Sequence, residues 1–209
     1  MFYKRFPLGP LWTNGYLFWD SDRYSFFVDP GGDPIDVIQY IKNHGLKLNS
    51  IFLTHGHIDH ILGVEALVGY SGADLYVHEK DLPRLADSGE NLSSWMGNSF
   101  STEISAIAFN DGSVFRVGSY SIKVIHTPGH TPGSSCLLVS LDKEQILLSG
   151  DTLFTRSVGR TDLPGGDGEE LLRSLKKLVD LPEDIIVLPG HGPDTILGEE
   201  IRNNPFWPL

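Results

Sequence analysis

The chain has 209 residues, 40% hydrophobic and 21% charged, a balance that excludes intrinsic disorder and suits the packed core of one domain. Its 27 acidic residues outnumber its 16 basic residues and give a formal charge of −11; with no cluster of Lys and Arg, binding to nucleic acid or to a membrane surface is disfavoured. The single cysteine, Cys136, excludes an intramolecular disulfide.

The N-terminal segment predicts neither secretion nor membrane insertion. It mixes aromatic, charged and proline residues, and no apolar core of a signal peptide follows it. No apolar run elsewhere is long enough to span a bilayer, and no low-complexity linker divides the chain. We therefore expect a cytoplasmic protein with one domain over residues 1–209. For the aromatic residues near the two ends, such as Phe6, Trp12 and Phe206, we expect core packing.

The first predicted elements are a strand and a helix separated by a turn. Residues 24–28 form an apolar strand that is closed by Asp-Pro-Gly-Gly. Asp33 then caps a helix with Pro34 at its first position and Gly45 at its end. Three isoleucines spaced by three residues predict one buried face of this helix, namely Ile35, Ile38 and Ile41.

The middle of the chain alternates short strands with helices and hairpins. The elements predicted here are a strand over 50–53, a short helix over 61–68 and a strand over 75–77. The polar stretch 89–109 has no assignable pattern. Two hairpins follow, which pair 114–117 with 121–126 and 136–140 with 145–148.

The last predicted elements are a capped helix and a strand. Asp167 and Glu170 form a capping box for a helix that runs to about residue 179, and residues 185–188 form the final strand. Largely antiparallel hairpins, early and late in the chain, are interspersed with helices. This order predicts an α/β (α+β) fold in which helices cover a sandwich of sheets.

Four of the predicted strands run into loops that carry His or Asp. The strand over 50–53 leads to Thr-His-Gly-His-Ile-Asp-His at residues 54–60. The other three strands lead to His130, Asp151 and His191. Because rigid strands followed by short Gly/Pro loops hold side chains well, we expect these residues to meet at one rim of the fold.

The spacing within the first loop predicts a site for two metal ions. Residues two apart in an extended segment point to the same side, so His55 and His57 can bind one metal. Asp59 and His60 stand at a helix start, point elsewhere and can bind a second metal. Two metals about 3.5–4 Å apart need a shared ligand, for which Asp151 is the candidate. His130 and His191 complete the two ligand sets. Imidazole suits zinc, iron and similar ions, and the oxygen ligands widen the choice to manganese. Zinc is the metal expected, with iron or manganese as alternatives.

Other motifs have simpler interpretations. His44 and His78 are interpreted as surface histidines, and His126 as a structural residue beside the site loop. The Gly-Gly-Asp-Gly stretch at 165–168 lacks the Lys and Ser/Thr of a phosphate-binding loop, and we interpret it as a turn.

The pattern Thr-His-x-His-x-Asp-His, followed by His130, Asp151 and His191, resembles the signature of the metallo-β-lactamase superfamily. The resemblance spans residues 50–192 and implies an αββα sandwich, with two mixed sheets and the metals at one edge. It also implies the ligand sets. The first metal takes His55, His57 and His130, the second takes Asp59, His60 and His191, and Asp151 bridges them.

A finer resemblance concerns the segments after Asp151 and around His191. Ser-Gly-Asp-Thr-Leu-Phe at 149–154, Gly-Arg-Thr-Asp at 159–162 and Pro-Gly-His-Gly-Pro at 189–193 look like the glyoxalase II branch, closest to its short type II proteins. The extra helical C-terminal region of full-length glyoxalase II, which supplies much of the glutathione contact, has no counterpart after His191.

These features predict a hydrolase. A water held between the two metals, whose pKa the ions lower towards about 7, gives a hydroxide that attacks the carbonyl of a thioester or ester, and Asp59 orients it as the catalytic residue. The substrate expected is a hydroxyacylglutathione such as S-lactoylglutathione. The resting site keeps a charge of about +1, which favours an anionic small molecule. Arg156 and Arg160 are candidate substrate-binding residues for its carboxylate.

Several alternatives share these motifs. A lactonase uses the same seven ligands, whereas a secreted β-lactamase is disfavoured by the missing signal peptide and by the bridging aspartate. A tRNA-processing nuclease fits poorly with the acidic balance. An iron-dependent persulfide dioxygenase would use one iron on His55, His130 and Asp151. A non-catalytic metal-binding module would need a ligand set without an open position for water.

Overall fold

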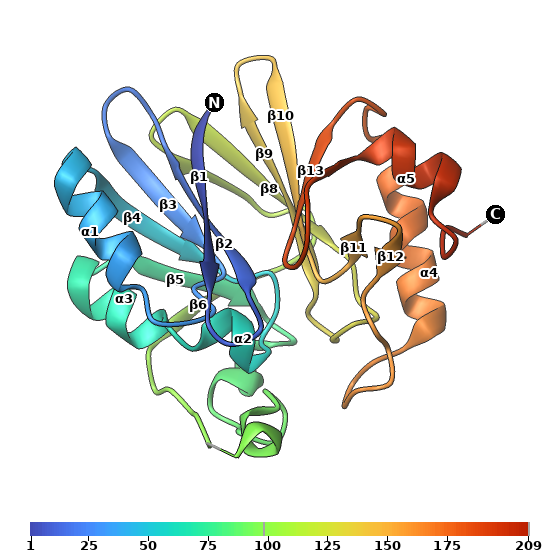
Figure 1. Ribbon diagram of the computed structural model, residues 1–209, viewed down its shortest axis with the longest axis horizontal. Coiled ribbons are helices and arrows are strands. Elements are labelled where there is room, and N and C mark those ends of the chain that lie inside the picture. Colours follow the sequence, from blue (N-terminus) through green and yellow to red (C-terminus); the bar gives the residue numbers. More distant parts are fainter. Residues whose placement is uncertain (98, 209) are drawn as a thin grey trace.

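Two β-sheets face each other in the computed structural model, which describes residues 1–97 and 99–208 (Figure 1). Helices α1 and α3 cover the outer face of the first sheet, and α4 and α5 cover the outer face of the second (Figure 1). The predicted αββα sandwich of two mixed sheets is therefore confirmed. The chain crosses from one sheet to the other between β6 and β7.

The first sheet contains the N-terminal strands in sequence order. These strands are β1 (Phe2–Leu8), β2 (Thr13–Trp19), β3 (Tyr24–Val28), β4 (Lys47–Phe52), β5 (Asp74–His78) and β6 (Ala106–Phe109). The sheet is antiparallel from β1 to β3 and parallel from β3 to β6. It is thus more parallel than the sequence predicted, because a helix between β3 and β4 returns the chain to the same end of the sheet.

The second sheet has the order β14-β13-β10-β9-β8-β7. Its strands are β7 (Val114–Val117), β8 (Tyr120–His126), β9 (Ser135–Leu141), β10 (Glu144–Gly150), β13 (Ile186–Pro189) and β14 (Thr195–Ile196). Neighbouring strands are antiparallel except for β10 and β13. Both predicted hairpins are confirmed. A small separate ribbon pairs β11 (Leu153–Phe154) with β12 (Ser157–Val158).

The helices are short. They are α1 (Ile35–His44), α2 (Ile58–Ile61), α3 (Val64–Ser71), α4 (Gly168–Lys177) and α5 (Leu197–Asn203), with 3₁₀ turns at Leu82–Leu85, Ser93–Met96 and Leu178–Asp180. Asp167 caps α4 as predicted, since its side chain accepts a hydrogen bond from Glu170 N at 2.9 Å. The single helix predicted over 61–68 is instead divided into α2 and α3.

The buried face of α1 differs from the prediction. Val37 and Ile41, four residues apart, are buried, whereas Ile35 is 55% exposed. A spacing of three residues falls short of the 3.6-residue turn, so the isoleucine series drifts off the buried stripe. Pro34 precedes the helix, and Asp33 Oδ1 accepts a hydrogen bond from the first helical N–H, that of Ile35, at 3.1 Å.

The core lies in three layers. The middle layer is between the sheets, where Phe18 and Phe26 of the first sheet share a cluster with Ile122 and Leu148 of the second. The outer layers lie under α1 and α3 and under α4 and α5. Among the terminal aromatic residues Phe6 is buried, but Trp12 is 73% and Phe206 53% exposed, so the expectation of core packing is wrong for those two.

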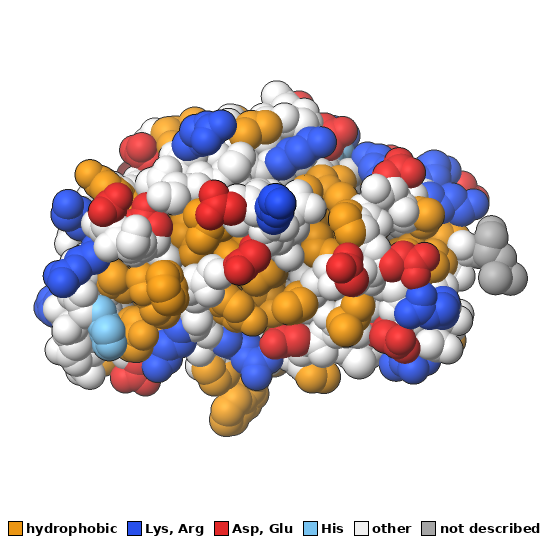
Figure 2. All heavy atoms as spheres, turned by 90° about the horizontal axis from the view of Figure 1, so that it is seen from above, with side chains coloured by type: hydrophobic (Ala, Val, Ile, Leu, Met, Phe, Trp, Pro, Cys, Tyr) orange, Lys and Arg blue, Asp and Glu red, His pale blue; other side chains and the backbone are white. Residues whose placement is uncertain are grey.

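The surface carries charges of both signs. On the face seen in Figure 2, Lys and Arg side chains are interspersed with Asp and Glu rather than gathered by sign. Among the described residues, no helix combines the length and apolarity needed to cross a bilayer.

Candidate metal centre

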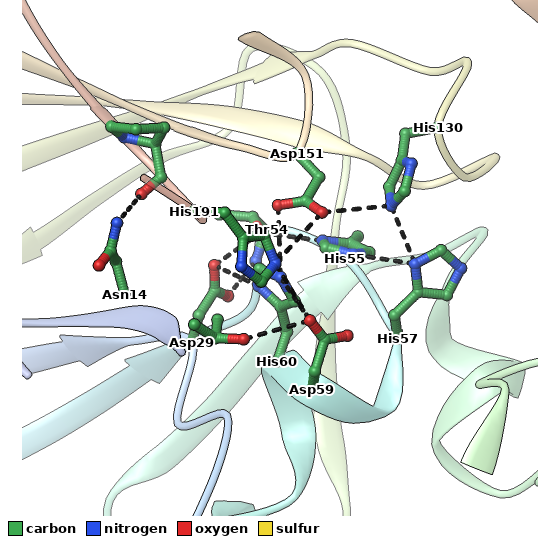
Figure 3. Close-up of polar contacts among 12 residues, drawn as sticks. Asn14, Asp29, Thr54, His55, His57, Asp59, His60, His130, Asp151 and His191 are labelled. Atoms are coloured by element: carbon green, nitrogen blue, oxygen red, sulfur yellow. Dashed lines mark hydrogen bonds and ion pairs between the residues drawn. The ribbon is translucent and has the colours of Figure 1, made fainter. Parts of the chain in front are cut away.

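Strand ends bring the predicted site residues together. Residues 54–60 follow β4, while His130, Asp151 and His191 follow β8, β10 and β13 of the other sheet. The structure places all seven predicted side chains in one cluster between the two sheets (Figure 3). Three groups in this cluster have ligand atoms within 4.8 Å of one another: His55, His57 and His130; His55, His60 and Asp151; and Asp59, His60 and His191.

Three imidazole nitrogens converge at the first triad. His57 Nδ1 lies 3.1 Å from His55 Nε2 and 2.9 Å from His130 Nε2. His130 Nδ1 lies 2.8 Å from the carbonyl oxygen of Arg160, which can only accept, so Nδ1 carries the proton and Nε2 presents its lone pair to the cluster. These contacts orient the ring as in a metal ligand.

His55 is oriented through a relay to a buried carboxylate. Thr54 Oγ1 donates to Asp29 Oδ2 at 2.7 Å, so it can only accept from His55 Nδ1, 3.2 Å away. The Nε2 lone pair of His55 therefore faces the cluster as well. A proton on His57 Nδ1 could be donated to His55 Nε2 or to His130 Nε2 but not to both. One cation would satisfy all three lone pairs, and the donor set of this triad fits a metal ion.

The second triad consists of Asp59, His60 and His191. His191 Nε2 lies 3.1 Å from Asp59 Oδ2, and His60 Nε2 lies 3.6 Å from the same oxygen. Asp151 stands between the two triads: its Oδ1 is 3.4 Å from His60 Nε2, and its Oδ2 is 3.6 Å from His130 Nε2. The two oxygens of Asp151 thus face both sets of ligands (Figure 3).

Buried polar atoms without partners mark the same place. Within the described residues, His57 Nε2, His60 Nε2 and Asp151 Oδ1 are inaccessible to solvent and form no hydrogen bond. Leaving such groups unpaired in the interior is unfavourable by about 1–3 kcal/mol each. A metal bound between His60 and Asp151 would satisfy two of these atoms, so the residues present fit such an ion.

Electrostatics divides the centre into two halves. Burial lowers the pKa of His55 well below 6.5 and, aided by His130, lowers the pKa of His57 to about 3, so both rings are neutral at pH 7. For His60, burial is outweighed by the charges of Asp151, Asp59 and Asp29, which raise its pKa well above 6.5. Neutral imidazoles therefore line one half, and a negative field that favours a cation fills the other.

Asp29 is a functional residue that the sequence interpretation missed. It follows β3 and was assigned to a turn, yet its carboxylate accepts from Thr54 N at 2.8 Å and lies 3.0 Å from His60 Nδ1. Its φ of +55° shows that the backbone is held in the left-handed region there. The available signal was its position, since an aspartate after a buried strand is the feature that identified Asp151.

Asn14 positions the loop of His191 from β2. Its side-chain amide donates to the carbonyl oxygens of Pro189 and Gly192, both at 3.0 Å, and its backbone N–H donates to Gly190 O at 2.7 Å. Tyr16 also donates to Pro189 O, at 2.8 Å. Figure 3 shows Asn14 beside the cluster rather than in it.

A cavity of about 320 Å³ opens onto the cluster. Apart from the predicted site residues, its walls are mostly apolar and comprise Leu11, Ile58, Leu92, Trp95, Met96 and Leu163. Arg160 also lines it, and this exposed side chain pairs with Asp162, Nε to Oδ1, at 2.7 Å. Arg156 does not line it: its guanidinium donates to Asn203 O at 2.7 Å. The structure thus brings one of the two predicted arginines to the site.

The remaining histidines lie outside the cluster. His78 is buried, so the interpretation as a surface histidine is wrong for it, and its ring stacks on His126 at 4.0 Å between centroids. His44 is exposed and stacks on Tyr40 at 3.9 Å. His126 Nε2 lies 2.9 Å from Pro132 O, in the loop that carries His130. This contact gives it the structural place beside the site loop that the sequence predicted.

Comparisons with known proteins agree with this geometry. A hydroxyacylglutathione hydrolase, GloC of Haemophilus influenzae, is 33% identical, and the match covers 96% of this chain and 95% of the relative. The crystal structure of BLEG-1 B3 metallo-β-lactamase has a TM-score of 0.91 and 40% identity, covering 98% of this chain and 99% of that one. The crystal structure of TTHA1623 in a di-iron-bound form has a TM-score of 0.85 and 36% identity, covering 97% and 99%.

The family model gives the broadest agreement. The model described as the metallo-β-lactamase superfamily matches residues 8–191, from the end of β1 to the last histidine of the cluster. That stretch contains β2 to β13, which form most of both sheets, and all seven converging side chains. With the fold and the clustered ligands in place, the chain belongs to the metallo-β-lactamase superfamily.

Proposed function

We propose that this protein is a metal-dependent hydrolase that cleaves a thioester, with a hydroxyacylglutathione such as S-lactoylglutathione as its substrate. The observation that carries the proposal is the paired arrangement of the ligands. Two triads of donors lie side by side, with Asp151 facing both of them. The relative GloC is named a hydroxyacylglutathione hydrolase, which favours this substrate class.

We assign the ligands of two divalent cations to the two triads. His55, His57 and His130 would hold one ion, and Asp59, His60 and His191 the other, with Asp151 shared. Bound there, the ions would supply an activated water near neutral pH and would polarise the substrate carbonyl. Zinc suits the imidazole-rich donor set, and iron is a second candidate because TTHA1623, a structural relative, has a di-iron-bound form.

The chain's own groups position the reactants. Asp59 Oδ2 takes the contacts with His191 and with Thr13 Oγ1, which donates to it at 3.1 Å. The other oxygen of Asp59 takes no part in them and can accept a hydrogen bond from the attacking water, which would orient it. A thiolate is a good leaving group, so a thioester requires no strong general acid.

The cavity suits a substrate with an apolar reacting end and an anionic tail. Leu11, Trp95 and Leu163 offer apolar walls that exclude water from the carbonyl. Arg160, at the exposed side of the cavity, would receive a carboxylate in exchange for its pairing with Asp162.

The test combines a metal assay with a panel of substrates. Protein expressed with zinc or with iron is analysed for bound metal, and S-lactoylglutathione hydrolysis is followed by release of free thiol. We expect about two metal ions per chain and thioester turnover. His55→Ala, the control, should lose bound metal and at least about 100-fold in activity, because it removes a ligand and not only its support.

The other arms of the panel separate the alternatives. A lactone tests ester hydrolysis on the same site, and a cephalosporin tests the activity in the name of BLEG-1. Oxygen uptake and sulfite release from glutathione persulfide test the dioxygenase. If fully metallated protein leaves the thioester intact, the proposal is rejected. The substrate of the panel that is converted then indicates the activity that replaces it.

A further inference from the structure

Asp81 joins two of the loops that carry the candidate metal ligands. It follows β5, and its side chain is completely buried. Its Oδ2 accepts from the backbone N–H of Gly56 at 2.8 Å, between His55 and His57. Its Oδ1 accepts from the backbone N–H of Gly133 at 2.7 Å, in the loop after His130. One carboxylate thus fastens both loops of the first triad.

A third contact lies beside the ligand itself. Thr131, the residue after His130, donates its hydroxyl to Asp81 Oδ2 at 2.7 Å. Asp81 also precedes the 3₁₀ turn Leu82–Leu85, but its side chain makes no capping hydrogen bond to that turn. The carboxylate therefore serves the two metal-binding loops and not the turn that begins beside it.

The backbone of the two loops passes close to Asp81 or its neighbour Arg84 at the glycines that donate to the carboxylate. A Cβ at Gly133 would lie 2.6 Å from the carboxyl carbon of Asp81, a separation that real Cβ atoms do not show. Only glycine can therefore occupy this position with the carboxylate in place. A Cβ at Gly56 would similarly lie 2.7 Å from the Cβ of Arg84.

Arg84 completes the arrangement beneath the site. It is buried, and its Nε lies 3.4 Å from Asp81 Oδ1. Its Nη2 donates to Pro164 O at 3.0 Å, next to Leu163 of the cavity wall, and its Nη1 donates to Glu90 O in the segment that leads to Leu92. The guanidinium charge compensates that of the buried carboxylate, and its hydrogen bonds connect Asp81 to the loops of Glu90 and Pro164.

We propose that Asp81, supported by Arg84, is the positioning residue of the metal centre. It holds the His55–His57 loop against the His130 loop so that their nitrogens converge before any metal binds. Asp81 touches neither substrate nor metal. The inference rests on the proposed metal-dependent function only in taking the first triad as a ligand set, and it does not depend on the substrate.

Asp81→Asn is the sharpest variant because it keeps the shape and removes one acceptor. Both carboxylate oxygens receive a backbone N–H, so the amide group of asparagine must face one of these donors in either orientation. Either Gly56 or Gly133 then loses its partner. Supporting residues of this kind affect metal affinity by about 10- to 100-fold when they are changed.

Metal-free protein is titrated with Co²⁺ alone, and binding is followed by visible absorption and by chelator competition. Wild type should bind two equivalents. Asp81→Asn should bind one of them about 10- to 100-fold more weakly, with an altered absorption spectrum. The control Tyr120→Phe removes a buried hydroxyl from the far end of β8; it should lower stability and leave both affinities unchanged.

Amide hydrogen exchange on the metal-free proteins gives a readout that involves no metal. In Asp81→Asn, exchange of the Gly56 or Gly133 N–H should accelerate, while amides of β8 and β9 keep wild-type rates. Should Asp81→Asn be insoluble, Thr131→Val removes only the hydroxyl donor and should show the same changes at smaller amplitude.

The outcomes separate the inference from the proposed function. If Asp81→Asn and Thr131→Val bind both cobalt ions like wild type, the positioning role is overturned even where thioester hydrolysis is observed. If wild type hydrolyses no thioester but Asp81→Asn still loses one tight cobalt ion, the substrate proposal fails and the positioning role stands.

Discussion

Asn14 acts on the candidate metal centre through the loop of His191 and not by touching a ligand. Its amide supplies donors for the carbonyls of Pro189 and Gly192. Both lie at a bend that carries the histidine away from the end of β13. A side chain of this kind leaves no signal in the sequence, since a single asparagine in an apolar stretch has no motif around it.

Replacing Asn14 by Ala should therefore destabilise the fold and loosen His191. Gly192 O loses this donor and Pro189 O keeps only that of Tyr16, and we expect the free energy of unfolding to fall by about 1–3 kcal/mol. Urea denaturation of the metal-free protein measures it. The matched change Asn43→Ala, at an exposed position of α1, should stay within about 0.5 kcal/mol of wild type. Equal effects of the two substitutions would contradict the role of Asn14.

The seven clustered residues could be predicted because each follows a recognisable buried strand. Spacing alone separated His55 and His57 from Asp59 and His60. The structure groups the first pair with His130 and the second pair with His191, and His55 and His60 also share a group with Asp151. Asp81 and Asn14 could not be predicted, because their partners are backbone groups far along the chain. Which backbone N–H or C=O a side chain meets is decided by tertiary packing, not by local pattern.

At the scale of elements, the hairpin of β1 and β2 was the main omission. In β1 the sequence mixes aromatic and charged residues with Pro7, and in β2 nearly every residue is buried, so neither strand alternates cleanly. Their identity as strands comes from pairing with each other and with β3. The hairpins of the second sheet, in which apolar strands flank turn residues, were predictable from sequence alone.

The N-cap of α4 offers a test of local structure. Asp167→Ala removes the acceptor of the Glu170 N–H and should lower the free energy of unfolding by about 0.5–2 kcal/mol. Thermal and urea unfolding measure this change. Glu169→Ala, two residues further along and exposed, is the matched control and should have little effect. If Asp167→Ala has the same free energy of unfolding as wild type, the cap contributes nothing to stability.

At the scale of the whole molecule, the interior of the sandwich holds groups that resist ionisation. Burial raises the pKa of the Cys136 thiol to about 11 and that of Tyr120 to about 12. Both side chains belong to the second sheet and face the packed layers. Unfolding releases them into water, where each loses its proton at a lower pH.

This difference predicts how stability depends on alkaline pH. A thiol that binds its proton more tightly in the folded state contributes fully below its unfolded pKa of 9.0, and the contribution is lost as pH rises through about 11. For Cys136 the loss is about 2–3 kcal/mol. Urea midpoints from pH 8 to 11 should fall less steeply in Cys136→Ala than in wild type. Parallel slopes would refute the assignment.

The candidate ligands come from both sheets, which are formed by different parts of the chain. The first, His55, follows a strand of the N-terminal sheet, and the last, His191, follows β13 of the other sheet near the C-terminus. During synthesis on the ribosome, the amino-terminal half contains the histidines of residues 55–60 but not the complete set of candidate ligands. A metal ion held by this set would therefore bind late in maturation, and an ion shared by both parts of the chain would link the two sheets.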